Sequence, residues 1–307
     1  MDRAHQRLCV WKRLLRNYEL YLFLLPALAY FLIFKYIPMY GIQIAFRDYV
    51  PSYGFWESQW VGMKHFQRFW ESYNFSTLIK NTLTLTFYSL VVGFPIPVIL
   101  AIMLNEQNHK WFKKTVQTVT YAPHFISLVV LCGMVITFFS PSKGVVNKLI
   151  SLLGGEPVYF LASVPAFKHL YVWTGIWQNM GWSSIIYLAA LSNVDPELIE
   201  ASVIDGAKKL QRIRYISLPC IMPTIITMLI LRCGNLMDVG FEKVYLLQND
   251  LNLSASEVIS TYVYRVGVQG GEYSFSAAVG VFNSVINFIL LIVVNRIAKA
   301  VGQAGLW

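Results

Sequence analysis

Long apolar runs separated by short polar segments dominate the pattern of this chain. A helix needs roughly 20 mostly apolar residues to cross about 30 Å of hydrocarbon. Six stretches meet this requirement, with approximate bounds 20–40, 78–104, 116–139, 170–191, 218–239 and 275–296. The pattern therefore predicts an all-α membrane protein with six transmembrane helices. Pro95 and Pro97 are expected to kink the second helix, and residues 143–153 to form a short helix outside the membrane.

The first apolar stretch is open to two interpretations. Its basic leader would suit a signal peptide and consists of Arg3, Arg7, Lys12, Arg13 and Arg16. However, the stretch is longer than the apolar region of a signal peptide, and no small-residue cleavage site follows it. We therefore expect an uncleaved first helix, with a segment 1–19, a six-helix domain over 20–297 and a tail 298–307.

Composition agrees with a membrane protein. The 307 residues are 56% apolar and only 13% charged, which is unlike a soluble domain. The net charge of +9 could indicate nucleic acid, but the apolar runs favour membrane lipid as the partner and no nucleic acid. The four cysteines form no Cys-x-x-Cys pair, and we expect them to be small apolar residues in or near helices: Cys9, Cys132, Cys220 and Cys233. No catalytic, P-loop or metal-ligand pattern occurs.

The distribution of Lys and Arg predicts the orientation. With the N-terminus inside, most of these residues fall in cytoplasmic segments, although the outer loops are longer. Cytoplasmic loops carry such an excess, so both termini and the loop 192–217 are expected inside. The first outer loop is rich in aromatic residues, which form either an interfacial belt or a docking surface for an external partner: Tyr49, Tyr53, Phe55, Trp56, Trp60, Phe66, Phe69 and Trp70.

The cytoplasmic loop 192–217 has the signals of two short helices. Asp195-Pro196-Glu197 can cap and start the first helix. Gly206 allows a sharp turn, and a second helix is expected from near Lys208 to Pro219. Such a helix–turn–helix, lying flat under the membrane, could insert into a groove of a neighbouring protein and transmit its movement.

The same loop resembles the EAA loop of ABC-importer permeases. The match rests on the opening Glu-Ala, the Asp-Gly-Ala, the Leu-Pro and the final Pro223, although Ser202 stands where Ala is usual and Ile213 where an aromatic is usual. The resemblance implies that this loop couples the chain to a separate ATPase. The residues it assigns to coupling are Glu200, Ala201, Ser202, Asp205, Gly206, Ala207, Leu218 and Pro219.

A second resemblance covers nearly the whole chain. The segments 37–49, 121–127, 239–247 and 261–267 look like those of carbohydrate-uptake permeases of the polysaccharide and complex-oligosaccharide subgroup. It implies the maltose-type fold, a type I ABC importer permease architecture. It also implies four kinds of partner in a bacterial cell membrane: a second permease forming a heterodimer, an ATPase dimer that binds ATP and Mg, an extracytoplasmic sugar-binding protein and an oligosaccharide.

Polar residues within span five suggest a translocation path. Arg232, Asn235, Asp238 and Glu242 recur at intervals of three, three and four, which predicts one stripe on a helix face. A charge at the bilayer centre costs roughly 2.5–3.5 kcal/mol, so Arg232 is expected to face protein or a wet cavity. Alternatively, Asp238 and Glu242 lie at the outer interface and reach water.

Spans four and six offer further candidates for sugar contact: Trp177, Gln178, Asn179, Trp182, Asn283 and Asn287. Amides can bind sugar hydroxyls, and aromatic faces can cover sugar rings. Each could equally hold helices together. In span two, the stripe of Thr82, Thr86, Ser89 and Gly93 predicts close helix packing, and His124 is expected to be a structural residue.

The combined interpretation is a permease subunit of an ATP-driven, binding-protein-dependent oligosaccharide importer, without enzymatic activity of its own. A permease for a non-sugar solute remains an alternative. A secondary transporter of a polar solute would need coupling-ion residues and a repeated half with broken helices, and no repeat is evident. A membrane enzyme would need a reactive cluster.

Overall fold

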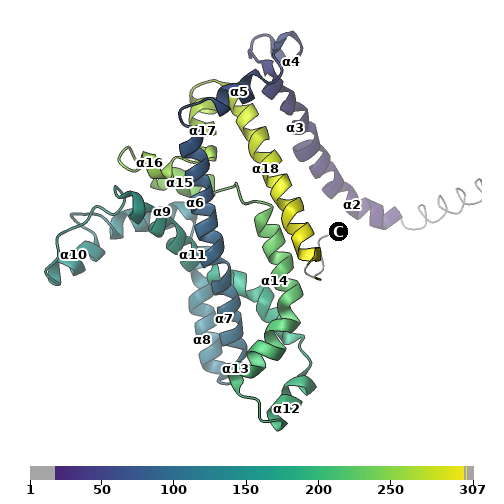
Figure 1. Cartoon of the computed structure of the whole chain (residues 1–307), viewed down its shortest axis with the longest axis vertical. Coiled ribbons are helices and arrows are strands. Elements are labelled where there is room, and N and C mark those ends of the chain that lie inside the picture. Colours follow the sequence, from purple (N-terminus) through teal and green to yellow (C-terminus); the bar gives the residue numbers. More distant parts are fainter. Residues whose placement is uncertain (1–17, 301, 303–307) are drawn as a thin grey trace, which may run out of the picture.

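The computed structural model describes residues 18–300 and 302. The basic leader, Cys9 and nearly all of the expected segments 1–19 and 301–307 lie outside the described residues. The described chain is mostly helical (Figure 1), and α12 lies at the opposite end of the molecule from α4 and α5. Cys132, Cys220 and Cys233 are free thiols.

The first predicted span is a continuous helical run. It comprises α2 (Tyr18–Phe31), the π-helix η1 (Leu32–Tyr36), α3 (Ile37–Met39) and the 3₁₀ helix η2 (Tyr40–Phe46). The run of 29 residues is long and apolar enough to cross a membrane. None of the α2 residues is buried, whereas η2 packs against α18 (Tyr273–Ala300). Figure 1 shows α2 leading away from the other helices.

The outer loop after this run folds into a small hairpin. Strands β1 (Arg47–Asp48) and β2 (Gln59–Trp60) pair antiparallel, with α4 (Gly54–Glu57) between them and α5 (Lys64–Trp70) after them. Several predicted outer aromatics pack on one another, as do Tyr49 and Phe55 at 5.4 Å between ring centroids. Whether the exposed ones meet lipid or a partner stays a prediction.

The second predicted span is confirmed as an apolar helix over Phe75–Asn105. It comprises α6 (Phe75–Gly93) and α7 (Pro95–Asn105). The division falls at Phe94, and Pro95 is the first residue of α7. Proline suits this position because it has no N–H to donate.

The third span is wrong as a continuous helix. The chain forms α8 (Lys110–Tyr121) and the 3₁₀ helix η3 (Ala122–Phe125), then turns by 99° into α9 (Leu128–Phe138). Ile126 and Ser127 have extended backbone, with ψ of 126° and 148°. The Ser127 hydroxyl accepts the Val130 N–H at 3.4 Å and so caps α9. The apolar run hid this break because hydropathy does not report backbone conformation.

The remaining long helices are α11 (Val164–Ser192), α14 (Leu218–Cys233) and α18. Among the described residues, four helices are long and apolar enough to cross a membrane, or five if the bent pair α8–α9 forms one span. The fourth predicted span is a helix, but α11 lies outside that set. The short helix expected at 143–153 is confirmed as α10 (Val145–Leu152).

Shorter elements complete the fold. The loop 192–217 holds α12 (Pro196–Ile204) and α13 (Lys209–Arg212), and the π-helix η4 (Ile213–Ser217) joins α13 to α14. After α14 come α15 (Phe241–Leu247), α16 (Leu253–Ser256), α17 (Ile259–Val263) and the π-helix η5 (Tyr264–Gln269). Three buried apolar clusters hold these elements together, around Phe167, Phe69 and Tyr187.

Candidate functional site

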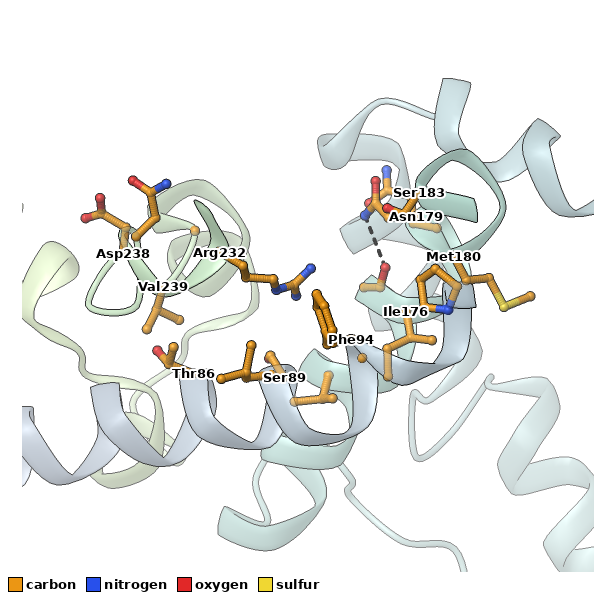
Figure 2. Close-up of a pocket in the computed structure, with 18 of the residues that line it drawn as sticks. Thr86, Ser89, Phe94, Ile176, Asn179, Met180, Ser183, Arg232, Asp238 and Val239 are labelled. Atoms are coloured by element: carbon orange, nitrogen blue, oxygen red, sulfur yellow. Dashed lines mark hydrogen bonds between the residues drawn. The ribbon is translucent and has the colours of Figure 1, made fainter. Parts of the chain in front are cut away.

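A pocket of about 850 Å³ lies between α6, α11, α14 and the segment 235–243. Figure 2 shows Thr86 and Ser89 on one wall, Asn179 and Ser183 on another, and the Arg232 side chain extending toward Phe94. The lining mixes apolar side chains with a few amide, hydroxyl and charged groups, which is typical of small-molecule sites.

Six of the ten predicted path residues line this pocket: Gln178, Asn179, Trp182, Arg232, Asn235 and Asp238. The other four, Trp177, Glu242, Asn283 and Asn287, are not part of its lining. Whether any of the ten contacts a substrate stays a prediction.

The predicted stripe along span five is wrong as a helix face. Helix α14 ends at Cys233, so Asn235 and Asp238 lie in the following loop and Glu242 lies in α15. The Asp238 carboxylate accepts a hydrogen bond from Asn283 at 3.3 Å. The pocket therefore receives Arg232 from a helix end and Asp238 from a loop, and the spacing of three and four residues is coincidental.

Arg232 stands near the C-terminal end of α14 and reaches across the pocket. A Cβ atom placed on Gly93 of α6 would lie 3.8 Å from its Nη2 atom. Within the described chain, the guanidinium has no hydrogen bond or ion pair. The sequence prediction that Arg232 faces protein or a cavity is consistent with this position.

Lys243 is a pocket residue that sequence reasoning missed. Its side chain is buried at 7% exposure and lines the pocket. The ammonium donates to the Tyr171 carbonyl oxygen at 2.7 Å and lies 4.8 Å from the centre of the Tyr171 ring. It sits against α11, because a Cβ on Gly175 would lie 3.0 Å from Nζ. The helix α15 has only seven residues, so its sequence offers no periodic pattern from which Lys243 could be predicted to line a pocket.

Three of the lining residues on α11 also hold the broken third span. Gln178 Nε2 donates to the free carbonyl of Ile126 at 2.9 Å. Asn179 Oδ1 lies 3.1 Å from Nδ1 of His124, and the Trp182 ring stacks on His124 at 4.6 Å. A backbone carbonyl freed by a helix break needs such a partner within a membrane protein. The structural interpretation of His124 is thus consistent with its contacts.

Asn283 and Asn287 of α18 brace the loop behind the pocket. Asn287 Oδ1 accepts the backbone N–H of Met237 at 2.8 Å, and Met237 is buried. Asn283 Nδ2 donates to Asp238, while its Oδ1 is buried without a hydrogen-bond partner in the described chain. The two residues therefore fix the loop that carries Asn235 and Asp238.

The small-residue stripe of α6 shows the predicted close packing at two residues and forms a pocket wall at the others. Thr82 and Gly93 are buried: the Thr82 hydroxyl accepts the Ile259 N–H at 3.2 Å, and a Cβ atom on Gly93 would lie 3.3 Å from Cγ1 of Ile176 on α11. Thr86 and Ser89, together with Gly93, line the pocket. Thr86 Oγ1 is shielded and has no hydrogen-bond partner among the described residues. The hydroxyl groups of Thr86 and Ser89 were the feature of the sequence from which a pocket wall could have been predicted.

The loop 192–217 forms the first short helix that its sequence predicts, whereas the second helix runs past its predicted end at Pro219. Asp195 Oδ1 accepts the Glu197 N–H at 2.9 Å at the start of α12. Gly206 has a φ of +75°, a value that other residues adopt only with strain. The second helix continues without a break through η4 into α14, over Lys209–Cys233.

Contacts at Glu106 tie this loop to the end of α7. The Lys209 ammonium donates to the Glu106 carbonyl oxygen at 3.0 Å. The Glu106 carboxylate lies 3.8 Å from Lys209 and 3.9 Å from Arg212. Sequence reasoning missed Glu106, because nothing local links it to the loop. Glu200, Asp205 and Gly206 are exposed, and Ile204 is exposed at 85%.

Comparisons with known proteins agree on one family. The model of the family described as "Binding-protein-dependent transport system inner membrane component" matches residues 82–303. Protein LplB of Bacillus subtilis is 46% identical over 95% of this chain and 92% of its own length. The polygalacturonan/rhamnogalacturonan transport system permease protein YteP of the same organism is 45% identical over 96% and 92%.

A solved structure shares the fold over the same extent. It is a chain of a bacterial alginate ABC transporter in complex with an alginate pentasaccharide-bound periplasmic protein. That chain is 42% identical to this one with a TM-score of 0.89, and the match covers 96% of this chain and 99% of the other.

Proposed function

This chain belongs to the family of binding-protein-dependent transport system inner membrane components, and we propose on this premise that it is a permease subunit of an ATP-driven oligosaccharide importer. The observation that carries the substrate class is the pocket of about 850 Å³ lined by amide, hydroxyl and aromatic groups. Relatives named for polygalacturonan or alginate transport support it.

The transport cycle requires a contact with the ATPase at the cytoplasmic end and a translocation path for the sugar at the pocket. The exposed loop around Glu200 and Gly206 receives the movement of a separate ATPase dimer, which binds ATP and Mg. Glu106 and the unbroken run Lys209–Cys233 then carry that movement toward the pocket. A second permease supplies the other half of the path, and an external binding protein delivers the sugar.

The proposed membrane arrangement has six crossings in the domain 20–297, with α11 and the bent pair α8–α9 counted as crossings. Both termini and the loop 192–217 are cytoplasmic in this arrangement. In a variant without cysteines, Asn193→Cys should resist an impermeant thiol reagent added outside, whereas Tyr73→Cys, fully open in the described chain at 97% exposure, should react. The reverse labelling pattern would refute the orientation.

The decisive experiment is reconstitution of the complete importer in lipid vesicles. Uptake of a labelled oligosaccharide should require ATP, the ATPase subunits, the binding protein and this chain together. Uptake that continues without the ATPase but follows an ion gradient would refute the proposal and favour a secondary transporter.

A further inference from the structure

Four basic side chains mark a route from the outer part of α6 and α11 to the pocket. Lys80 lies five residues after the start of α6, and Lys168 lies four residues after the start of α11. Lys243 and Arg232 line the pocket itself. Lys168 precedes Gly175 by seven residues, or two helical turns, so both lie on one face of α11 about 10 Å apart. Lys243 contacts that face at Gly175.

None of these four cations forms an ion pair within the described residues. The carboxylates elsewhere hold other basic groups: Asp48 pairs with Lys64, Glu272 with Arg68, Glu106 with Lys209 and Arg212, and Glu257 with Arg265. Lys243 bonds only a neutral carbonyl and an aromatic ring. Asp238 is the one carboxylate that lines the pocket in the described chain, and it is bound to Asn283.

The outer two cations lie on neighbouring helices, since Tyr88 Oη of α6 is 2.7 Å from Nδ1 of His169, the residue after Lys168 on α11. Two like charges that lie together without a counter-ion destabilise each other and the fold. An anionic group that enters between them relieves this repulsion, and a charge held within a partly dry pocket gains more from an opposite charge than one in water.

We propose that Lys80, Lys168, Lys243 and Arg232 form a cationic track that selects carboxylate-bearing, acidic oligosaccharides over neutral ones. This inference rests on the proposed function and adds the charge of the sugar and the residues that recognise this charge. The lysines attract the carboxylates as point charges, whereas the planar guanidinium of Arg232 can bind a carboxylate through two parallel hydrogen bonds.

The test compares one sugar skeleton with and without its charge. The complete importer is reconstituted in vesicles, and ATP-dependent uptake is measured for a uronic-acid tetrasaccharide and for its methyl ester, each with saturating binding protein. The parent should take up the acid faster than the ester. Arg232→Gln should lower the acid-to-ester ratio about tenfold, the value of one hydrogen bond to a charged group, while Arg232→Lys should retain most of the ratio.

Two further variants separate charge recognition from folding. Lys80→Gln combined with Lys168→Gln should lower acid uptake about threefold at low salt, and high salt should reduce this difference because it screens exposed charges. Lys148→Gln is the matched control, since this exposed lysine on α10 carries the same charge away from the track. It should leave both uptake rates unchanged.

The possible outcomes separate a failure of the cationic track from a failure of the proposed importer function. If Arg232→Gln and the double lysine variant slow acid and ester equally, or slow neither, the cationic track is refuted and the importer function stands. If the parent takes up neither sugar in an ATP-dependent manner, the proposed function fails and the track fails with it. If Arg232→Gln does not assemble, the double lysine variant decides alone.

Discussion

The loop 192–217 and the pocket are built from contacts of very different range. Within the loop, hydrogen bonds link residues two to five positions apart, as between Asp195 and Glu197 or between Arg212 and Ala207. At the pocket, the bonds between elements span 21 to 72 positions, the longest between Lys243 and Tyr171. The loop therefore takes its shape from its own sequence, whereas the pocket exists only once the helices have packed.

The largest effect on transport is expected when the backbone of the loop is distorted at one residue. Gly206→Pro should lower transport at least tenfold while the complex still assembles and the binding protein still binds sugar. Proline fixes φ near −65°, far from the +75° of Gly206, and it removes the N–H that donates to Val203 at 3.0 Å. Uptake, ATP hydrolysis and sugar binding are measured on the same reconstituted complex.

Gly154 offers a matched control in the loop after α10. It has a φ of +84°, and its N–H donates to Ser151 at 3.1 Å, so Gly154→Pro causes the same backbone damage away from the proposed ATPase contact. Its uptake should stay within twofold of the parent. Equal uptake by both variants would refute the coupling role of the loop.

The contrast also explains what the sequence could predict. The cap at Asp195, the turn at Gly206 and the apolar runs are local signals, and each predicted its element except the run 116–139, which hid a break. The stripe of Arg232, Asn235 and Asp238 assumed that α14 continues, but the chain leaves the helix at Cys233. Other features depend on partners far along the chain, namely the positions of Lys243 and Glu106 and the break at Ile126. The periodicity of a segment does not reveal such distant partners.

A residue outside the pocket that braces its loop through a long-range bond should act on transport through stability. Asn287→Leu removes the acceptor of the buried Met237 N–H, and an unsatisfied buried group costs about 1–3 kcal/mol. We expect a lower melting temperature of the complex and uptake that falls several-fold with the amount of folded protein. Both are measured on the same preparations.

Asn283→Leu is the companion variant, because its bond to Asp238 is long and its other polar atom is already unpaired. It should leave the melting temperature nearly unchanged. If Asn287→Leu slows uptake without lowering the melting temperature, direct contact between Asn287 and the sugar becomes the better account.

One long-range contact does reach the loop, and its removal should have a smaller effect. Glu106→Gln weakens the attraction of Lys209 and Arg212 but keeps the backbone carbonyl that binds Lys209. We expect transport to fall about twofold to threefold, with more ATP hydrolysed per sugar imported. Glu71→Gln, which alters an exposed acid bonded to Gln67 at the outer end, is the control and should leave that ratio unchanged. An unaltered ratio in Glu106→Gln would show that the loop moves independently of α7.

The smallest effect is expected at the outer ion pair of Arg68 and Glu272, which joins α5 to the start of α18. The hydrogen bond from Arg68 lowers the pKa of Glu272 below its ordinary value of 4.5. A carboxyl group with a lowered pKa stabilises the folded state above that ordinary value, and this stabilisation is lost as pH falls through the lowered pKa. Both side chains are about half exposed, so the gain at neutral pH should stay below about 1 kcal/mol.

Melting temperatures of the parent, Glu272→Gln and Arg68→Gln test this pair. Both variants should melt slightly below the parent at pH 7, and the differences should shrink together as pH falls from 4.5 and vanish below the lowered pKa of Glu272, because acid protonates the same carboxylate that the variants remove or leave unpaired. A difference that persists in acid would assign it to lost packing of Arg68 on Phe275. The pair spans 204 positions, farther than the bonds of the pocket described above, yet water weakens it. Burial, and not distance along the chain, therefore decides how much a long-range contact stabilises this protein.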